Sequence, residues 1–334
     1  MRRDRPHPTV VSDALACYPF DRPVARRLGR GFNAMYRVDT ADGARFALRV
    51  QRHGFGVDVV GAELAWLEAI RRDTDLAVPD PLRTLDNELV CIAATPSGPR
   101  LVVVFRWLTG RFLDAGLRPG HLHRMGALAA QLQAHGARFA SSALTPRGRV
   151  DAMTDEGRYR PDPFDQESQA EVVDLLGRQL GADVRAPVCS VIEQVRLVQQ
   201  RIGFGATVFG LQHGDLHQQN VLFRRAGIAA IDFDDCGHAQ HAYDLAVTIL
   251  EIRDRPDYPE LRTAVIAGFR TMGALSDQEE AAIDLLMVLR LLQLTVWRAR
   301  QLPLGDRVEP VVEAERADII GYLHRLATRA AQAV

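Results

Sequence analysis

The alternation of apolar and polar positions divides the chain into two parts with different periods. Residues 24–106 consist mainly of short apolar or alternating runs joined by turn residues, a pattern typical of antiparallel hairpins. One helix is predicted among them, at 61–72 (GAELAWLEAIRR), because Leu64, Leu67 and Ile70 fall on one face. We therefore expect the N-terminal part to be built around an antiparallel sheet.

The pattern changes after Trp107, where apolar residues recur with the spacing of a helix. The interval 208–233 is an exception, because its short strand-like runs (NVLF, IAAIDF) surround a polar stretch. We expect PDPFDQESQ (161–169) to be a loop or an insertion. Helices are predicted at 121–139, 187–201, 241–253, 259–272, 276–302 and 310–332.

These patterns predict an α+β chain with two lobes. The N-terminal, nucleotide-binding lobe would span residues 1–106, and the helical, catalytic and substrate-binding lobe residues 107–334. A length of 334 residues also favours two lobes over one core. Clefts between lobes are common ligand sites, so we expect a ligand-binding cleft between these two lobes.

Composition and charge exclude several classes of protein. The chain is 47% hydrophobic and 25% charged, with a formal net charge of −1, so no global field indicates a nucleic-acid or membrane partner. No run approaches the length of a membrane span, and the basic start lacks the apolar core of a signal peptide, which favours a cytoplasmic protein. The cysteines are far apart and form no CxxC pair, which argues against a structural zinc site or a disulfide framework. They are Cys17, Cys91, Cys189 and Cys236.

The basic residues are all arginine, since all 41 residues counted as Lys or Arg are Arg. Any role that a fold normally gives to lysine must therefore be filled by arginine or abandoned.

The stretch LQHGDLHQQNVLF (211–223) concentrates polar side chains between two apolar edges. Asp215 and Asn220 lie five residues apart, and Asp232 follows at the end of the IAAI strand. A strand–turn–strand between them would bring Asn220 and Asp232 together, and their oxygens suit Mg²⁺. Asp215 would lie nearby, able to accept a proton from an attacking hydroxyl. This arrangement is typical of phosphoryl transfer.

Three motifs, HGDLHQQN, AAIDFDD and YDLA, together resemble the aminoglycoside phosphotransferase and choline-kinase-like superfamily. With FALRV and ELAWLEAI upstream, the chain is most similar to the branch of stress-response Ser/Thr kinases and homoserine-kinase-like enzymes; the resemblance covers roughly residues 24–300. It implies a bilobal protein-kinase-like fold. The implied function is a kinase that transfers the γ-phosphoryl group of ATP, with Mg²⁺, to a hydroxyl of a small molecule or of protein Ser/Thr.

The resemblance also implies roles for individual residues of the polar stretch. Asp215 matches the catalytic base, and Asn220 and Asp232 match the Mg²⁺ ligands. His213 matches an architectural loop residue, and Asp244 matches an acid that caps a helix and braces the loop.

Other positions match the nucleotide site. Gly29, Gly31 and Asn33 in LGRGFNAMYRV are expected near the phosphates. The backbone of the joint around Phe105 and Trp107 is expected to hydrogen-bond adenine.

Strand three departs from the pattern of the superfamily, because Arg49 stands where lysine is often found. Glu63 matches the helix acid that pairs with this base. Arginine keeps the positive charge and can bind phosphate through two hydrogen bonds, so we interpret Arg49 as a working substitute.

Two alternative functions remain open, together with the acceptor. A nucleotide-binding pseudokinase or scaffold is one, because of Arg49, and a metal hydrolase using His213 and His217 is the other. The roles of His217, Asp234 and Asp235 and the oligomeric state are not readable from the sequence. Cationic acceptors and homoserine-like metabolites are both compatible with it. The acids that could line a cationic pocket are Asp151, Asp155, Glu156, Asp162, Asp165 and Glu167.

Overall fold

The computed structural model of the chain forms two compact units. Unit 1 comprises Met1–Phe112, Phe139–Pro146 and Leu222–Asp234. Unit 2 comprises Leu113–Arg138, Arg147–Val221 and Asp235–Val334. The lobe boundary expected between residues 106 and 107 stays a prediction. The structure describes residues 9–28, 33–52, 54–96, 98–113, 116–139, 147–153, 166–300, 317 and 320–321.

The described part of the chain contains helices, 3₁₀ turns and strands. The helices are α1 (Thr9–Ala16), α2 (Val57–Asp73), α3 (Pro119–Gly136), α4 (Gln166–Leu180), α5 (Arg185–Ile202), α6 (Ala242–Leu250), α7 (Tyr258–Arg270) and α8 (Asp277–Arg300). The 3₁₀ turns are η2 (Ala182–Val184), η3 (Gln218–Asn220) and η4 (Phe233–Asp235). The strands are β1 (Val24–Leu28), β2 (Ala34–Asp39), β3 (Arg45–Val50), β4 (Pro81–Leu82), β5 (Cys91–Ala93), β6 (Arg100–Arg106), β7 (Phe209–Gln212), β8 (Val221–Arg224), β9 (Gly227–Ala230) and β10 (Gly237–Gln240).

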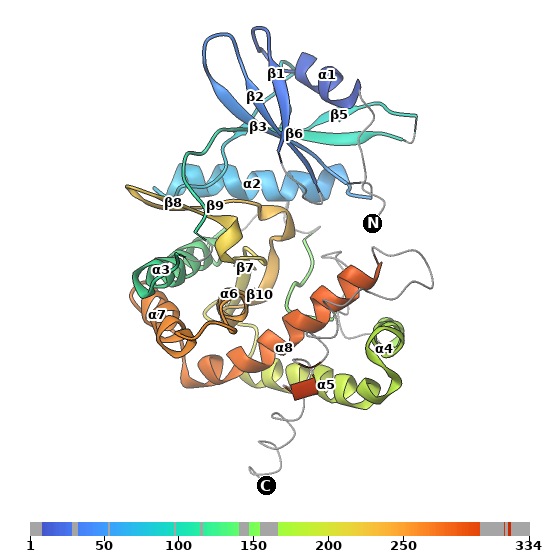
Figure 1. Cartoon of the computed structure of the whole chain (residues 1–334), viewed down its shortest axis with the longest axis vertical. Coiled ribbons are helices and arrows are strands. Elements are labelled where there is room, and N and C mark those ends of the chain that lie inside the picture. Colours follow the sequence, from blue (N-terminus) through green and yellow to red (C-terminus); the bar gives the residue numbers. More distant parts are fainter. Residues whose placement is uncertain are drawn as a thin grey trace. The chain divides into compact units, whose positions relative to one another are not determined.

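Unit 1 is built around an antiparallel sheet in the order β1-β2-β3-β6-β4, with β5 also paired to β6 (Figure 1). Side chains alternate between the two faces of a strand. In β3, Phe46, Leu48 and Val50 are buried in one apolar cluster with residues of α1. The intervening Arg49 pairs instead with Glu63 of α2. The alternation therefore places one charged side chain of the central strand against a helix.

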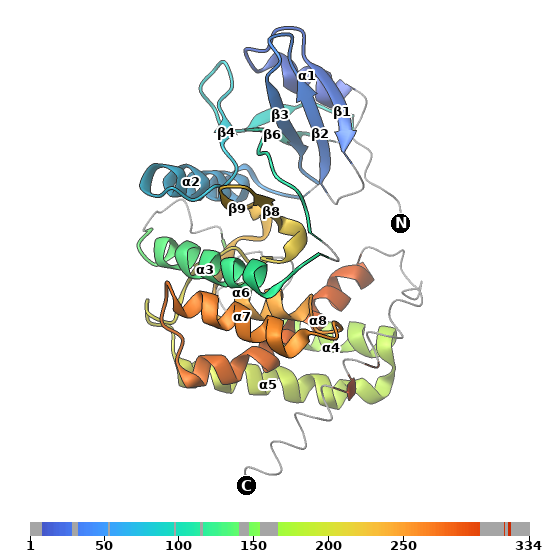
Figure 2. The same cartoon turned by 60° about the vertical axis from the view of Figure 1, so that its left-hand side comes forward.

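Unit 2 carries the helices from α3 to α8 and the short antiparallel pair β7–β10. Helices α3 and α7 lie side by side, and α8 packs against α6 and α5 (Figure 2). Within the ranges that the structure describes, no helix has the length and apolar character needed to cross a membrane.

The predicted α+β organisation is confirmed, with differences at particular segments. The antiparallel sheet, the helix expected at 61–72 and the predicted helices between residues 121 and 302 are present, with boundaries shifted by a few residues. The loop predicted at 161–169 is wrong for residues 166–169, which begin α4, while 161–165 lie outside the described residues. Helix α1 was not predicted. The helix predicted at 310–332 falls almost entirely outside the described residues.

Two of the cysteines lie together despite their distance in sequence. The Sγ atoms of Cys17, which follows α1, and Cys91, which begins β5, are 2.7 Å apart, and both thiols are free. The sequence analysis did not anticipate this contact. Packing of α1 on the sheet brings them together, and no local spacing motif records it.

Candidate active site

The polar stretch begins where β7 ends, and a buried acid from α6 holds its first turn. The two carboxylate oxygens of Asp244 accept hydrogen bonds from the backbone N–H groups of His213 and Gly214, each at 2.9 Å. Nδ1 of His213 accepts in turn from the backbone N–H of Asp215 at 3.3 Å. His213 is architectural and Asp244 braces the loop, as the resemblance implies, whereas the expected helix cap is not seen, because Asp244 lies in the first turn of α6 and α6 has no side-chain cap. Thr248, one turn after Asp244, donates to the carbonyl oxygen of Leu216 at 2.5 Å.

The glycine between His213 and Asp215 is required by the backbone. Gly214 has φ +82°, a left-handed conformation that favours glycine. A Cβ atom there would lie 2.3 Å from the carbonyl oxygen of Asp235. The sharp turn that presents Asp215 therefore depends on a residue without a side chain.

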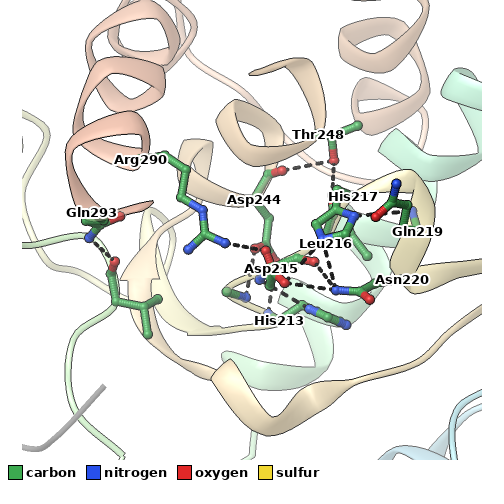
Figure 3. A network of polar contacts seen from close by, with 12 residues as sticks. His213, Asp215, Leu216, His217, Gln219, Asn220, Asp244, Thr248, Arg290 and Gln293 are labelled. Carbon is green, nitrogen blue, oxygen red and sulfur yellow. Dashed lines mark hydrogen bonds and ion pairs between the residues drawn. The ribbon is translucent and has the colours of Figure 1, made fainter. Parts of the chain in front are cut away.

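Three side chains surround the carboxylate of Asp215, and two of them belong to the same stretch (Figure 3). Nδ2 of Asn220 donates to Oδ2 of Asp215 and to its carbonyl oxygen, both at 2.9 Å. Nε2 of His217 is 3.2 Å from the same Oδ2. Nδ1 of His217 accepts from the backbone N–H of Gln219, so the proton of the neutral ring lies on Nε2 and points at Asp215.

The third side chain is Arg290, which the sequence analysis did not single out. It comes from α8, and its Nη2 donates to Oδ1 of Asp215 (Figure 3). On the next turn of α8, Gln293 donates to the carbonyl oxygens of Val150 and Ala152 at 2.8 and 2.7 Å. Its Oε1 accepts from the hydroxyl of Tyr243 at 2.7 Å. These contacts fix the turn of α8 that presents Arg290.

The charges in this cluster separate the pKa values of its two acids. Burial favours the protonated form of Asp215, yet the Arg290 guanidinium and the His217 ring hold its pKa well below the ordinary value. Burial raises the pKa of Asp244 to about 7, because the N–H groups of His213 and Gly214 offset only part of the lost hydration. Burial works against protonation of His217, but the Asp215 carboxylate raises the pKa of that ring. Asp215 therefore stays ionised at neutral pH.

In unit 1, the base of strand three and the acid of α2 form the expected pair. Nη1 and Nη2 of Arg49 donate to the two carboxylate oxygens of Glu63 at 2.9 and 2.7 Å. Both side chains are buried, and the guanidinium also lies 5.2 Å from the centre of the Phe105 ring. With its amide oxygen turned toward Arg49, Gln51 accepts from Nη2 at 2.9 Å and from Nε at 3.1 Å.

The second metal-ligand candidate, Asp232, has an unusual backbone. Its φ is +65°, its side chain is 48% exposed, and its Oδ1 is 4.0 Å from Nη1 of Arg49. Non-glycine residues are uncommon in this region, although aspartate tolerates it better than most. The nearby Asp234 accepts from Nδ2 of Asn33 at 2.7 Å, so Asn33 links this segment to the start of β2.

The remaining nucleotide-site expectations have different outcomes. Gly29 and Gly31 lie outside the described residues. The backbone N–H of Trp107 donates to the carbonyl oxygen of Arg45 at 3.1 Å, so it is engaged inside unit 1. Phe105 is buried in β6. Adenine binding at this joint stays a prediction, as does the Mg²⁺ site that Asn220 of unit 2 and Asp232 of unit 1 would share.

The acidic pocket considered for a cationic acceptor is not supported at Asp151. This residue is fully buried, with its carboxylate bound to Nε of Arg149 at 2.9 Å and to the N–H of Gln240 at 2.8 Å. Asp151 links the segment 147–153 to β10, and its carboxylate is not available to a ligand. Glu167 lies in α4. Asp155, Glu156, Asp162 and Asp165 fall outside the described residues.

Comparison with known proteins places these features in a family. The model of the phosphotransferase enzyme family matches residues 24–286. An uncharacterized protein of Deinococcus radiodurans is 28% identical over 283 residues, covering 83% of this chain and 77% of that protein. A second, from Synechocystis, is 24% identical over 260 residues, covering 77% of this chain and 68% of that protein.

Solved structures show the same fold. A microcompartment-associated aminopropanol kinase is similar with a TM-score of 0.75 at 24% identity, covering 95% of this chain and 94% of that one. An amicoumacin kinase in complex with AMP-PNP and Ca²⁺ also has a TM-score of 0.75, at 17% identity, covering 97% of this chain and 94% of that one. A spectinomycin phosphotransferase with ADP and its substrate has a TM-score of 0.63 at 12% identity, covering 91% of this chain and 90% of that one.

The family match spans most of the chain and includes Arg49, Glu63, Asp215, Asn220 and Asp232. The resemblance inferred from the motifs is thus confirmed: the chain belongs to the phosphotransferase enzyme family.

Proposed function

We propose that the protein is an ATP- and Mg²⁺-dependent kinase that transfers the γ-phosphoryl group to a hydroxyl of a small molecule. The observation that carries this proposal is the orientation of Asn220. Its Nδ2 is occupied by two oxygens of Asp215, so its amide oxygen is left to act as a hard ligand. One loop therefore supplies an ionised carboxylate and, next to it, an oxygen suited to a divalent cation.

The residues present fit Mg²⁺. Asn220 offers an amide oxygen, and Asp232 offers a carboxylate whose side chain is 48% exposed. Such side chains bind Mg²⁺ together with water and phosphate oxygens. When bound, the ion would neutralise charge on the phosphates and orient them.

Asp215 would orient the acceptor hydroxyl and take its proton. In a loose phosphoryl-transfer transition state the hydroxyl needs positioning as much as proton removal. A carboxylate with a low pKa suits that role, because it remains ionised and able to accept a hydrogen bond from the hydroxyl. The proton would then pass to Asp215 late, as the new O–P bond forms.

Arg49 supports an active enzyme over a pseudokinase. Its guanidinium is held by Glu63, the residue that the family pattern pairs with the strand-three base. A cation is therefore present where the phosphates of ATP are expected to bind. The acceptors of the similar structures are small molecules, namely an aminopropanol, amicoumacin and spectinomycin. We accordingly propose a small alcohol as acceptor and not a protein Ser/Thr.

The test is ADP release from MgATP across a panel of amino alcohols, sugars, aminocyclitols and hydroxy amino acids. Asp215→Asn keeps the shape and removes the charge, so it should lower turnover by about 10²–10⁴-fold while nucleotide affinity changes little. Asp284→Asn is the matched control, because Asp284 also pairs with an arginine, Arg262, at 2.7 Å. EDTA should abolish turnover in every active variant. Turnover of Asp215→Asn within a few-fold of the unmodified protein would contradict the assignment.

A further inference from the structure

The contacts of Asp215 leave one direction open on its carboxylate. An ionised carboxylate offers about four lone-pair directions, two on each oxygen. Oδ2 is contacted by Asn220 at 2.9 Å and by His217 at 3.2 Å, so its two directions are used. Oδ1 is contacted by Arg290. Within the part of the chain that the structure describes, this leaves one direction on Oδ1, beside the guanidinium.

We infer that Arg290 is a positioning residue that holds the Asp215 carboxylate so that this last direction of Oδ1 receives the acceptor hydroxyl. The inference rests on the proposed function, in which Asp215 is the base. Without Arg290 the carboxylate would be held through Oδ2 alone and could rotate about its Cβ–Cγ bond. The hydroxyl would then meet a carboxylate that is no longer aimed at it.

The surroundings of Arg290 support a precise role. The guanidinium lies among Asp215, Tyr243 and Asp235, which are the charged or ionisable groups that stabilise its charge. Its side chain is only 15% exposed. Gln293 fastens the same face of α8 to the loop at Val150 and Ala152. An arginine held this firmly can fix the orientation of its partner, which an exposed, mobile pair would not do.

Three variants test the inference. Arg290→Met removes the charge and keeps much of the length, and Arg290→Lys keeps one point charge without the planar fork. Arg262→Met is the matched control. Arg262 of α7 pairs at 2.7 Å with Asp284 of α8, the helix that also carries Arg290. One measurement is made on each variant: MgATP turnover on an alcohol identified by the panel, with kcat and the KM for ATP determined separately.

In Arg290→Met kcat should fall about 10- to 100-fold with the KM for ATP nearly unchanged, since orientation and not nucleotide binding is lost. Arg290→Lys should recover part of this loss, and Arg262→Met should not show it. A kcat in Arg290→Met that matches Arg262→Met would overturn the inference. The failure of the proposed function would look different, because Asp215→Asn itself would then remain active.

A different observation, in unit 1, carries a second inference. The geometry points to Cys17 and Cys91 as a dithiol that a small disulfide can oxidise. Their Sγ atoms are already 2.7 Å apart, so little movement separates them from a bond. Cys17 is partly exposed and can react first, whereas burial and the neighbouring Cys17 and Asp13 raise the pKa of Cys91 to about 12.

The exchange balances with a low-molecular-weight disulfide as oxidant. The Cys17 thiolate attacks one sulfur of the reagent and releases one small thiol. Cys91 then attacks the Cys17 sulfur of the mixed disulfide and releases the second small thiol, so both protons leave on the two released thiols. The resulting Cys17–Cys91 disulfide links the residue that follows α1 to the first residue of β5.

The experiment treats the reduced protein with oxidised glutathione, alkylates the remaining thiols and maps the peptides without reduction. We expect a linked Cys17–Cys91 peptide, while the exposed Cys189 carries glutathione or the alkyl group. Cys91→Ser should convert the link into a stable glutathione adduct on Cys17. Recovery of Cys17 and Cys91 as separate alkylated or glutathione-bearing peptides from the unmodified chain would overturn the inference.

Discussion

Two arginine–carboxylate pairs of the candidate site differ in how many oxygens of the acid are bonded to the arginine. In unit 1, Arg49 and Glu63 share two parallel hydrogen bonds, and their side chains are 2% and 1% exposed. In unit 2, Arg290 donates one hydrogen bond to Asp215, and the side chains are 15% and 18% exposed. The first pair uses both oxygens of its acid, whereas the second leaves part of one oxygen open. A pair in which both carboxylate oxygens are bonded to the arginine stabilises a buried charge. A pair that leaves part of one oxygen unbonded can hold a reactive carboxylate in position.

Neutralising the acid of each pair should give the largest contrast in stability. Glu63→Gln leaves the buried Arg49 with only more distant counter-charges, such as Asp232, and should cost about 3–5 kcal/mol of the free energy of unfolding. Asp215→Asn should cost less, about 1–2 kcal/mol, because Arg290 is more exposed and still lies near Asp235. Urea unfolding of both variants measures the difference. Equal losses in the two variants would mean that the number of bonded carboxylate oxygens does not determine how much a pair contributes to the free energy of unfolding.

Replacing the base of the Arg49–Glu63 pair should have a smaller effect. Arg49→Lys keeps the charge but loses the fork that matches Glu63 and the contact with the Phe105 ring. We expect a loss of about 1–2 kcal/mol in the free energy of unfolding and retention of most of the turnover. Arg49→Ala, which removes the cation, should lose turnover. Full activity in Arg49→Ala would show that this position does not bind the phosphates.

Asp244 adds a third case to the comparison of the two acids, because it is a buried acid that no arginine contacts among the described residues. Its pKa is raised to about 7 in the folded protein, while in the unfolded chain it is near 3.8. The folded state therefore binds more protons between these values, so the contribution of Asp244 to stability falls as pH rises through this window and is constant above it.

Asp244→Asn removes this titration. Between about pH 6 and pH 7, the stability of the unmodified protein relative to Asp244→Asn should therefore decrease, by at most about 1.4 kcal/mol. Urea unfolding of both proteins at several pH values measures the change. A relative stability that rises over this interval would show that Asp244 is ionised well below it.

The parts of the site that the sequence could predict are those written in short motifs. Asp215 and Asn220 share one loop, and their contact follows from a spacing of five residues. The pairing of Arg49 with Glu63 followed from the resemblance and is present. The sheet and most helices were readable because burial of one face imposes a period on the side chains.

The parts that could not be predicted depend on contacts between distant segments. Arg290 follows Asp215 by 75 residues, and Cys91 follows Cys17 by 74. One signal for Arg290 was available: between Leu285 and Val296 the chain is apolar except for Arg290, Gln293 and Thr295, and Arg290 is the only charged residue there. A lone arginine in such a run needs a buried partner. The identity of that partner depends on how α8 packs, and the apolar run does not specify the packing.

The exclusive use of arginine limits how the protein can be chemically controlled. With no lysine in its 334 residues, the chain has no side-chain amine for acetylation or for amine-reactive reagents. A nucleotide analogue carrying an amine-reactive group would find no lysine to capture at the position of Arg49. The guanidinium there also keeps its proton across the whole pH range in which proteins fold. Control of this cation therefore has to come from its contacts, chiefly Glu63, and not from titration or acylation of the base itself.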